Sequence, residues 1–198
     1  MKVVLASRNA KKLIELRRIL TPIIPDIEVL GLDDVAPFDE PAETEPTFDG
    51  NALIKARACL KATGLPSLAD DSGICVDALN GMPGVLSARW SGAGDAANNA
   101  LLLTQLGDVP AERRSAQFRC AIALCVSDGV EVIEHGVMPG RILAGEQGSG
   151  GFGYDPLFAA DGYEVSTAEL TPTEKDAISH RGMALRLIAP HVAAALLR

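Results

Sequence analysis

The feature that most restricts the fold of this sequence is a pair of long β-rich runs near the middle of the chain. They read AQFRCAIALCVSD, residues 116–128, and VEVIEHGVMPGRIL, residues 130–143, and they meet at Asp128-Gly129. Asp-Gly between two such runs is a strong signal for a β-hairpin, because the favoured hairpin turns need residues that tolerate positive φ. The runs therefore predict an antiparallel strand pair, around which the other elements must be arranged.

The start of the chain predicts a strand that turns directly into a helix. Residues 2–6 form an apolar run of strand length, and from Asn9 onward leucines recur at helical spacing. A second strand candidate, IEVLGL at 27–32, follows the prolines that end this helix. Strand–helix alternation combined with a central hairpin implies an α/β protein with a mixed sheet and helices packed on it.

Four further segments can be assigned from local signals. Thr47 can cap a helix over about 48–63. SLAD and GICVDAL are two strand-like pieces on either side of an Asp-Asp-Ser-Gly junction, and DAANNALLLTQL is a helix. The TPTE sequence at 171–174 is a capping box with proline at the first helical position. A last helix, which Ser179 can cap, should be kinked or broken by Pro190.

Length, composition and charge narrow the class of protein. The 198 residues contain no internal repeat or linker, which predicts a single domain over 1–198. No apolar run reaches transmembrane length and the N-terminus lacks signal-peptide features, so we expect a cytoplasmic protein without a membrane partner. The net charge of −8 argues against nucleic-acid binding but does not exclude a small anionic ligand. The four cysteines lack metal-ligand spacing and are expected to be buried thiols.

Two neighbouring acids, Asp70 and Asp71, stand inside the short stretch SLADDSG. In an extended chain their side chains point to opposite sides, so one can face a cleft while the other is solvated or hydrogen-bonded. A Mg²⁺ site needs one or two carboxylates together with phosphate oxygens and waters. Glu43 and Glu45, in the acidic loop 33–47, are candidates for a second carboxylate, and this loop is either a mobile surface loop or the rim of a site.

Two formal motif matches do not fit their usual context. Asp-Ser-Gly at 71–73 matches the aspartic-protease motif, but such enzymes need two copies and the chain has one. The GSGGFG sequence at 148–153 matches a dinucleotide-binding pattern, but it lies late in the chain and no helix follows it. This glycine-rich segment is either a flexible loop or a loop that places Phe152 and Tyr154 against a ligand.

The ASRNAKK sequence marks a helix N-terminus that can hold phosphate. Free N–H groups and the helix dipole favour an anion there, Ser7 and Asn9 can donate further hydrogen bonds, and Lys11 or Lys12 adds positive charge. The alternative is that Ser7 or Asn9 merely caps the helix and the lysines are solvated. Three residues near the C-terminus, Lys175, His180 and Arg181, also have two alternatives. They either bind the ligand or belong to the solvated start of an amphipathic helix.

Six segments, taken in order, resemble the inosine/xanthosine triphosphate pyrophosphatases, a family that removes non-standard purine nucleotides. The segments are SRNAKK (7–12), ETEPTFDGNALIKARA (43–58), ADDSG (69–73), GMPGVLSARWSG (81–92), GGFGYDP (150–156) and EKDAISHRGMAL (174–185). Each segment is short, but six in the right order over nearly the whole chain are highly specific. The resemblance implies an elongated mixed β-sheet flanked by helices, with two lobes and a central substrate cleft, and usually a homodimer.

The same resemblance implies a reaction and a set of site residues. The reaction is the Mg²⁺-dependent hydrolysis of ITP, dITP or XTP to the monophosphate and pyrophosphate, which cleanses the nucleotide pool. Glu43 and Asp71 would bind the metal, Asp71 would be the catalytic base, and Phe152 would stack on the purine. The substrate-binding residues that it implies are Ser7, Arg8, Asn9, Ala10, Lys11, Lys12, Lys55, Ser72, Phe152, Gly153, Tyr154, Asp155, Lys175, His180 and Arg181.

One departure from the family pattern is Gly50, because many relatives have an acid at the position before Asn51. Relative to Thr47 this is the capping-box position, so we expect a weaker helix cap, by about 1 kcal/mol. A second-metal role for the missing acid is left open by the sequence.

Two other functions are weighed against the pyrophosphatase. A phosphatase that releases orthophosphate is disfavoured, because the Asp pair lacks the D-x-D spacing of the common aspartyl-phosphate enzymes. A noncatalytic nucleotide or RNA binder is disfavoured by the negative charge, and it would not need Asp71.

Overall fold

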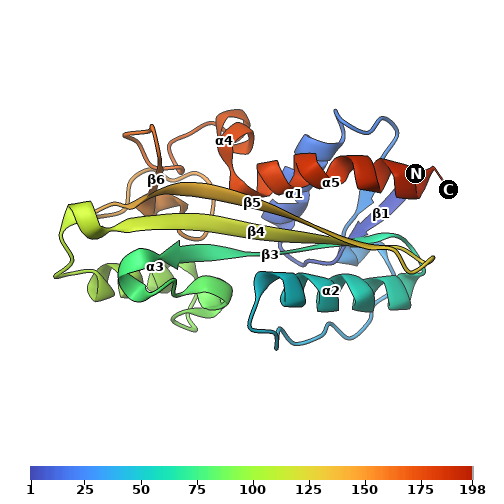
Figure 1. Cartoon of the computed structure of the whole chain (residues 1–198), viewed down its shortest axis with the longest axis horizontal. Coiled ribbons are helices and arrows are strands. Elements are labelled where there is room, and N and C mark those ends of the chain that lie inside the picture. The colour runs from blue at the N-terminus through green and yellow to red at the C-terminus, as the bar shows by residue number, and fades with distance from the viewer. Residues whose placement is uncertain (198) are drawn as a thin grey trace. The chain divides into compact units, whose positions relative to one another are not determined.

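The structure is a computed structural model that describes residues 1–197 (Figure 1). Its main elements are β1 (Lys2–Leu5), α1 (Ala10–Leu20), β2 (Glu28–Leu30), α2 (Phe48–Thr63), β3 (Ser67–Val76), α3 (Asp95–Gln105), β4 (Ser115–Cys125), β5 (Glu131–Ile142), β6 (Phe158–Ala160), α4 (Pro172–Ile178) and α5 (His180–Leu196). The strands form one sheet in the order β2-β1-β3-β4-β5-β6. Since β1 is parallel to β2 and β3 while β6 is antiparallel to β5, the predicted mixed α/β sheet is confirmed.

The chain divides into two compact units made of discontinuous segments. Unit 1 comprises Met1–Asp71, Cys120–Gly136 and the C-terminal part from Arg181, whereas unit 2 comprises Ser72–Arg119 and Val137–His180. Each unit has its own apolar cluster or clusters, described separately below. The first segment of unit 1 ends at Asp71 and its last segment begins at Arg181, so two predicted site residues stand at the ends of unit 1 segments.

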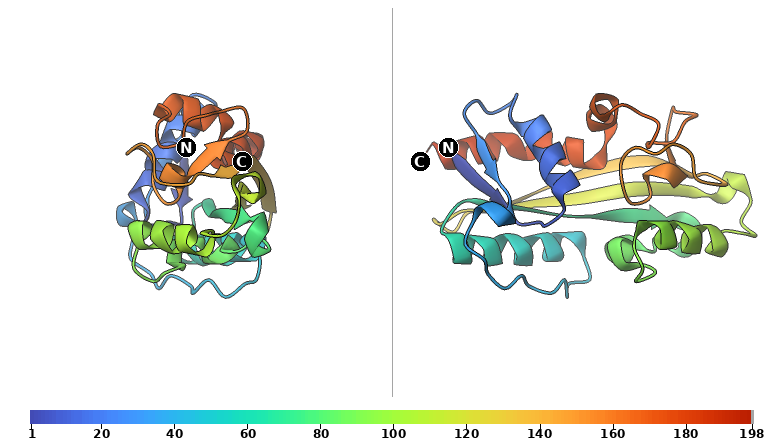
Figure 2. Two further views of the ribbon diagram at one scale, coloured as in Figure 1. Left: turned by 90° about the vertical axis from the view of Figure 1, so that its left-hand side faces the viewer. Right: turned by 180° about the vertical axis from the view of Figure 1, so that it is seen from behind.

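In unit 1, α1 and α5 cover one face of the strands and α2 covers the other, as Figure 1 and the two views of Figure 2 show. The strand residues alternate accordingly: Ile122 and Leu124 pack with α1 and α5, while Ala121 and Ala123 face α2. The stripe of α2 on this side is also small, with Ala52, Ala56 and Cys59 fully buried. Small residues on both partners let α2 lie close to the sheet, next to the strand that carries Asp71.

In unit 2, α3 packs on the outer parts of the long strands. Leu102 of α3 and Leu106, directly after this helix, join Ile74 of β3 and Phe118 of β4 in one buried cluster. Phe118 and Phe158 meet edge to face, with ring centroids 4.8 Å apart, a favourable arrangement of two aromatic rings. The cluster gives the glycine-rich segment that follows β5 a rigid support.

The hairpin and the helix caps were predicted correctly from local sequence. Gly129 has φ of +84° in the turn between β4 and β5, and the Asp128 side chain accepts the Val130 N–H at 3.1 Å. The bounds of α2 are those predicted, and the capping box at the start of α4 is present. The four cysteines are buried thiols. No helix in the described part of the chain is long and apolar enough to cross a membrane.

Two breaks predicted from the sequence, one between strands and one in a helix, are not found. The Asp-Asp-Ser-Gly junction does not divide two strands, because β3 runs unbroken through it. Gly73 is needed there for close packing, not for a turn: a Cβ would lie 2.2 Å from the Gly84 carbonyl oxygen and 2.4 Å from Ser87 Oγ. Of the kink or break predicted at Pro190, the break is not found, since α5 continues past it to Leu196.

Candidate active site

The turn between β1 and α1 is organised by Asn9. Its Oδ1 accepts the N–H groups of Lys11 and Lys12, at 3.0 and 3.3 Å, and its own N–H is donated to Ser7 Oγ at 3.2 Å. Asn9 therefore caps α1, but Lys12 is not solvated as the capping alternative expected, because its ammonium group pairs with Asp70. Anion binding at this turn stays a prediction. The turn is exposed, apart from Ser7 and Lys12, which are half-buried, so it remains accessible to an anion.

Asp70 accepts hydrogen bonds from two cations on the α1 and α5 side of the sheet. Its Oδ2 lies 3.0 Å from Lys12 Nζ and accepts the Arg181 guanidinium through Nε and Nη2, at 3.2 and 3.1 Å. Arg181 Nη1 donates to Glu15 at 2.6 Å. Although burial alone would lower the pKa of Arg181, Asp70 and Glu15 raise it above its ordinary value. The predicted hydrogen-bonded role of Asp70, on the side opposite Asp71, is confirmed.

This network changes what Arg181 can do. The guanidinium is buried and bonded to two carboxylates through three nitrogens, so it fastens the start of α5 to β3 and α1. The predicted contact of Arg181 with a purine would require these bonds to open.

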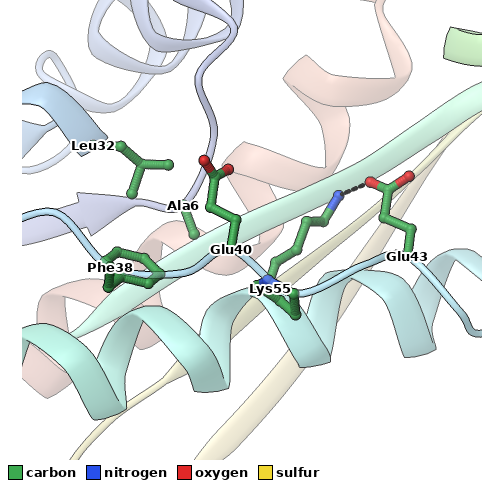
Figure 3. Close-up of a pocket in the computed structure, with 7 residues that line it drawn as sticks. Ala6, Leu32, Phe38, Glu40, Glu43 and Lys55 are labelled. Atoms are coloured by element: carbon green, nitrogen blue, oxygen red, sulfur yellow. Dashed lines mark hydrogen bonds and ion pairs between the residues drawn. The ribbon is translucent and has the colours of Figure 1, made fainter.

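Asp71 lies on the α2 side, where Lys55 and Asn51 reach it from one helix face. Lys55 Nζ donates to Asp71 Oδ1 at 3.1 Å and to the Asp70 carbonyl at 2.8 Å. It also donates to Glu43 at 2.8 Å (Figure 3). Asn51 Nδ2 donates to Asp71 Oδ2 at 3.2 Å. The site thus joins two carboxylates around one ammonium group, which we call the Asp71 centre: Glu43, Asn51, Lys55 and Asp71.

The electrostatics of the Asp71 centre follow from burial. Burial raises the pKa of Asp71 to about 6; Lys55 and Lys12 oppose this rise, and Glu43 adds to it. Burial would lower the pKa of Lys55, but Asp71, Asp70 and Glu43 outweigh it and raise that pKa. Lys55 therefore stays charged while Asp71 titrates close to neutrality.

The Asp71 centre suits a divalent cation. Glu43 and Asp71 already share one positive charge at hydrogen-bond distance, and carboxylate oxygens are the ligands that Mg²⁺ prefers. Among residues 1–197 no group of three or more His, Cys, Asp or Glu side chains is arranged to hold a metal. Two carboxylates are nevertheless enough for Mg²⁺, because it keeps several waters and takes further ligands from substrate phosphates.

The acidic loop forms the rim of a cavity beside this centre. The cavity measures about 160 Å³, and Figure 3 shows Lys55 rising from α2 toward Glu43 at its edge. Its lining residues are Ala6, Leu32, Phe38, Glu40, Pro41, Glu43 and Lys55. Arg8 pairs with Glu40 and, at 3.7 Å, with Asp33, so ion pairs join the exposed β1–α1 turn to this rim. The acidic loop therefore lines a cavity, and its role as the rim of a ligand site stays a prediction.

Unit 2 gathers a second set of predicted residues around Asp155. Lys175 Nζ donates to Asp155 at 2.5 Å and lies 5.0 Å from the centroid of the Phe152 ring. The same carboxylate accepts the Phe152 N–H at 2.8 Å and the Thr167 hydroxyl at 3.0 Å. Asp155 is buried, so it orients Phe152 and Lys175 rather than facing a ligand itself.

His180 and Tyr154 pack within unit 2. The His180 ring stacks on Phe118 at a centroid distance of 4.9 Å and an angle of 10°. Tyr154 is 3% exposed and donates its hydroxyl to the Ser87 carbonyl at 2.8 Å. The sequence allowed the Tyr154 side chain to lie against a ligand, and this is not found, because the Tyr154 ring is buried in the apolar cluster of unit 2.

Sequence reasoning missed several residues that hold the site together. Asn51 bonds Asp71, and Glu15 completes the network of Arg181. In unit 2, Asp95 accepts the Gly153 N–H at 2.8 Å and Asn99 donates to the Gly153 carbonyl at 3.2 Å. The available signal was helical spacing, since Asn51 stands one turn before Lys55, as Asp95 does before Asn99. Their partners come from distant segments and could not be read from that spacing.

The fold and the Asp71 centre together define an α/β protein with an acid–lysine site suited to a cation and a phosphorylated ligand. Comparison with known sequences then gives the family. The chain belongs to the Ham1 family, whose model matches residues 3–191.

Several relatives and solved structures are similar over nearly the whole chain. A dITP/XTP pyrophosphatase from Nocardia farcinica is 61% identical over 196 residues, covering 98% of this chain and 95% of that protein. A crystal structure titled nucleoside-triphosphatase / dITP/XTP pyrophosphatase, from Mycobacterium abscessus, is 54% identical with a TM-score of 0.77 and covers 96% of this chain and 100% of that one. A HAM1 protein from Coxiella burnetii is 41% identical with a TM-score of 0.87, covering 98% and 100%.

Proposed function

We propose that this protein is a nucleoside-triphosphate pyrophosphatase that hydrolyses non-standard purine nucleotides, ITP, dITP and XTP, to the monophosphate and pyrophosphate. The observation that carries this proposal is the Asp71 centre, in which a buried carboxylate with a pKa of about 6 stands beside a lysine and a second carboxylate. The names of relatives more than 50% identical over nearly the full chain, all dITP/XTP pyrophosphatases, support dITP and XTP as substrates.

Asp71 serves as the base that orients and deprotonates the attacking water. A general base works best when its pKa is close to the operating pH, and burial brings Asp71 into that range. Lys12 and Lys55, which bond the two acids in the free protein, supply positive charge for the triphosphate. Mg²⁺ held by Glu43 and Asp71 would neutralise phosphate charge when bound. Charge neutralisation and positioning are the main needs of phosphoryl chemistry.

Phe152 and Lys175 recognise the purine. Phe152 offers a half-buried ring for stacking. The Lys175 ammonium group lies over that ring while it is bonded to Asp155, and a further N–H of this group would be donated to a 6-keto oxygen. Adenine carries an amino donor at that position, and an unpaired donor in a dry pocket is costly, which favours hypoxanthine and xanthine. His180, stacked in the same unit, is the further candidate for a purine contact.

We also propose that the protein acts as a homodimer in the cytoplasm. The buried thiols of all four cysteines suit a reducing compartment, and the family resemblance supports the dimer. Light scattering coupled to gel filtration tests the dimer, and a mass equal to the 20.7 kDa of one chain would contradict it.

Product analysis tests the activity. Purified protein with Mg²⁺ is expected to release pyrophosphate from ITP, dITP and XTP and to release little pyrophosphate from ATP. The Asp71→Asn variant should release no pyrophosphate from any of these substrates. Each reaction is followed by separating monophosphate, diphosphate, pyrophosphate and orthophosphate. Orthophosphate as the direct product, with a diphosphate left behind, would show a phosphatase and refute the proposal.

A further inference from the structure

We propose that Asn51 is a positioning residue that ties the acidic loop and the Asp71 carboxylate into one clamp, and so holds Glu43 and Asp71 ready for a divalent cation. Its effect on turnover rests on the proposed function, but its effect on cation binding does not. Asn51 has no exposed surface, so it cannot act by touching substrate.

On the loop side, Asn51 pairs with both polar groups of one backbone residue. Its Oδ1 accepts the Glu45 N–H at 3.0 Å, and its Nδ2 donates to the Glu45 carbonyl at 3.2 Å. Glu45 stands two residues after Glu43, in a loop without helix or strand. The paired bonds therefore fix the backbone from which Glu43 extends toward Lys55.

On the strand side, Asn51 acts together with Lys55. Asn51 Nδ2 donates to Asp71 Oδ2 and Lys55 Nζ donates to Asp71 Oδ1, so the two oxygens of this carboxylate are held from successive turns of α2. An amide suits this place because it supplies one acceptor and two N–H donors, and three bonds are made. The opposite orientation of the amide would turn its oxygen toward the carboxylate, which would repel it.

Gly50 makes the clamp possible. A Cβ at this position would lie 2.5 Å from Glu45 Cβ and 2.7 Å from Glu45 Cγ, so any other residue would push the loop away from α2. The Gly50 N–H is still donated to the Thr47 side chain at 3.1 Å, so this helix cap is retained. The exchange of the usual acid for glycine thus lets Glu45 approach closely enough for Asn51 to hold its backbone.

Two variants test the clamp from different sides. Asn51→Leu removes all three bonds with little change in volume, and Gly50→Ala displaces Glu45 without touching Asn51. Mn²⁺ titration of the substrate-free full-length protein, followed by the paramagnetic signal of free Mn²⁺, measures cation affinity. We expect about 10- to 100-fold weaker binding for Asn51→Leu, the usual effect of losing a group that orients metal ligands, and a smaller loss for Gly50→Ala.

The combination and a matched control separate positioning from general stability. The double variant should bind Mn²⁺ no more weakly than Asn51→Leu alone, because both changes break one unit. Urea unfolding of Asn51→Leu and Gly50→Ala measures general stability, so a loss of Mn²⁺ affinity in protein that is folded under the titration conditions reports positioning and not unfolding. Asn98→Leu removes another buried asparagine, bonded to Ser91, Ser87 and Ala88, and should leave Mn²⁺ affinity unchanged.

Turnover gives a second measurement. With dITP as substrate, Asn51→Leu should lower kcat far more than it raises KM, because positioning acts on the reacting groups. Wild-type Mn²⁺ affinity in folded Asn51→Leu, or in Gly50→Ala if the first variant does not fold, would overturn the clamp. Absence of pyrophosphate release by the wild-type protein would instead refute the proposed function and leave the Mn²⁺ comparison valid.

Discussion

Asp71 occupies a position where an ionised carboxylate is unfavourable, and this is what suits it to accept a proton. Its side chain is 6% exposed, and burial raises its pKa from 3.8 to about 6 despite the nearby lysines. Asp70, the residue before it, is also buried, but it accepts hydrogen bonds from Arg181 and lies 3.0 Å from Lys12. Adjacent acids on opposite faces of one strand therefore serve different purposes: one is a structural anchor, and the other can gain and lose a proton.

Replacement of Asp71 by asparagine is expected to abolish turnover while stabilising the metal-free protein above pH 6. Because the carboxyl pKa is raised on folding, its contribution to stability is fully present below pH 4 and is lost as pH rises through about 6. Asparagine mimics the protonated form, so the gain at pH 8 should approach about 3 kcal/mol. Urea unfolding of both proteins at pH 4 and pH 8 measures this gain in the free energy of unfolding. A difference between the two proteins that is the same at both pH values would contradict the raised pKa of Asp71.

At the scale of elements, the sequence predicted those that depend on neighbouring residues. The cap at Thr47 located α2 correctly, and Asp128-Gly129 located the hairpin. The division of β3 was wrong because two adjacent acids normally mark a surface loop. They lie inside a buried strand here because cations from α1, α2 and α5 neutralise them, and a pattern along the chain does not show such partners.

The same limit applies to the site. The resemblance named Asp71, Lys55 and Glu43, which the structure brings together. It also named Tyr154 and Arg181, whose side chains are buried in the apolar cluster and in the Asp70 network. A motif identifies which stretch matters, but which side chain faces a ligand depends on packing between distant segments.

Helix α3 illustrates this at the scale of an element, because it holds the peptide groups on both sides of Gly153, the residue that follows Phe152. Asp95 and Asn99, one turn apart, bond the N–H and the carbonyl of Gly153. We expect Asn99→Leu to raise KM for dITP about 5-fold with a smaller change in kcat, since one buried hydrogen bond contributes about 1 kcal/mol. Steady-state kinetics measure this, with Thr104→Val on the exposed side of α3 as control; an unchanged KM would show that the Gly153 contact does not position the base.

At the scale of the whole molecule, the predicted substrate contacts separate by unit. Lys12, Lys55, Glu43 and Asp71, the groups suited to phosphate and cation, belong to unit 1. Phe152 and Lys175, suited to the purine, belong to unit 2. Each unit also has its own core, so each group of side chains is supported by packing within its own unit.

The division predicts that the two ends of the substrate can be tested separately. Inorganic tripolyphosphate carries the charged end alone and should inhibit dITP hydrolysis competitively. Phe152→Ala should raise KM for dITP about 10-fold or more, because base–aromatic stacking contributes about 1–3 kcal/mol, yet leave the inhibition constant of tripolyphosphate unchanged. Lys12→Met should raise both the KM for dITP and the inhibition constant of tripolyphosphate, because it removes a positive charge from unit 1. If Phe152→Ala weakened tripolyphosphate as strongly as dITP, Phe152 would be supporting the phosphate site, and the assignment of phosphate and purine to separate units would be wrong.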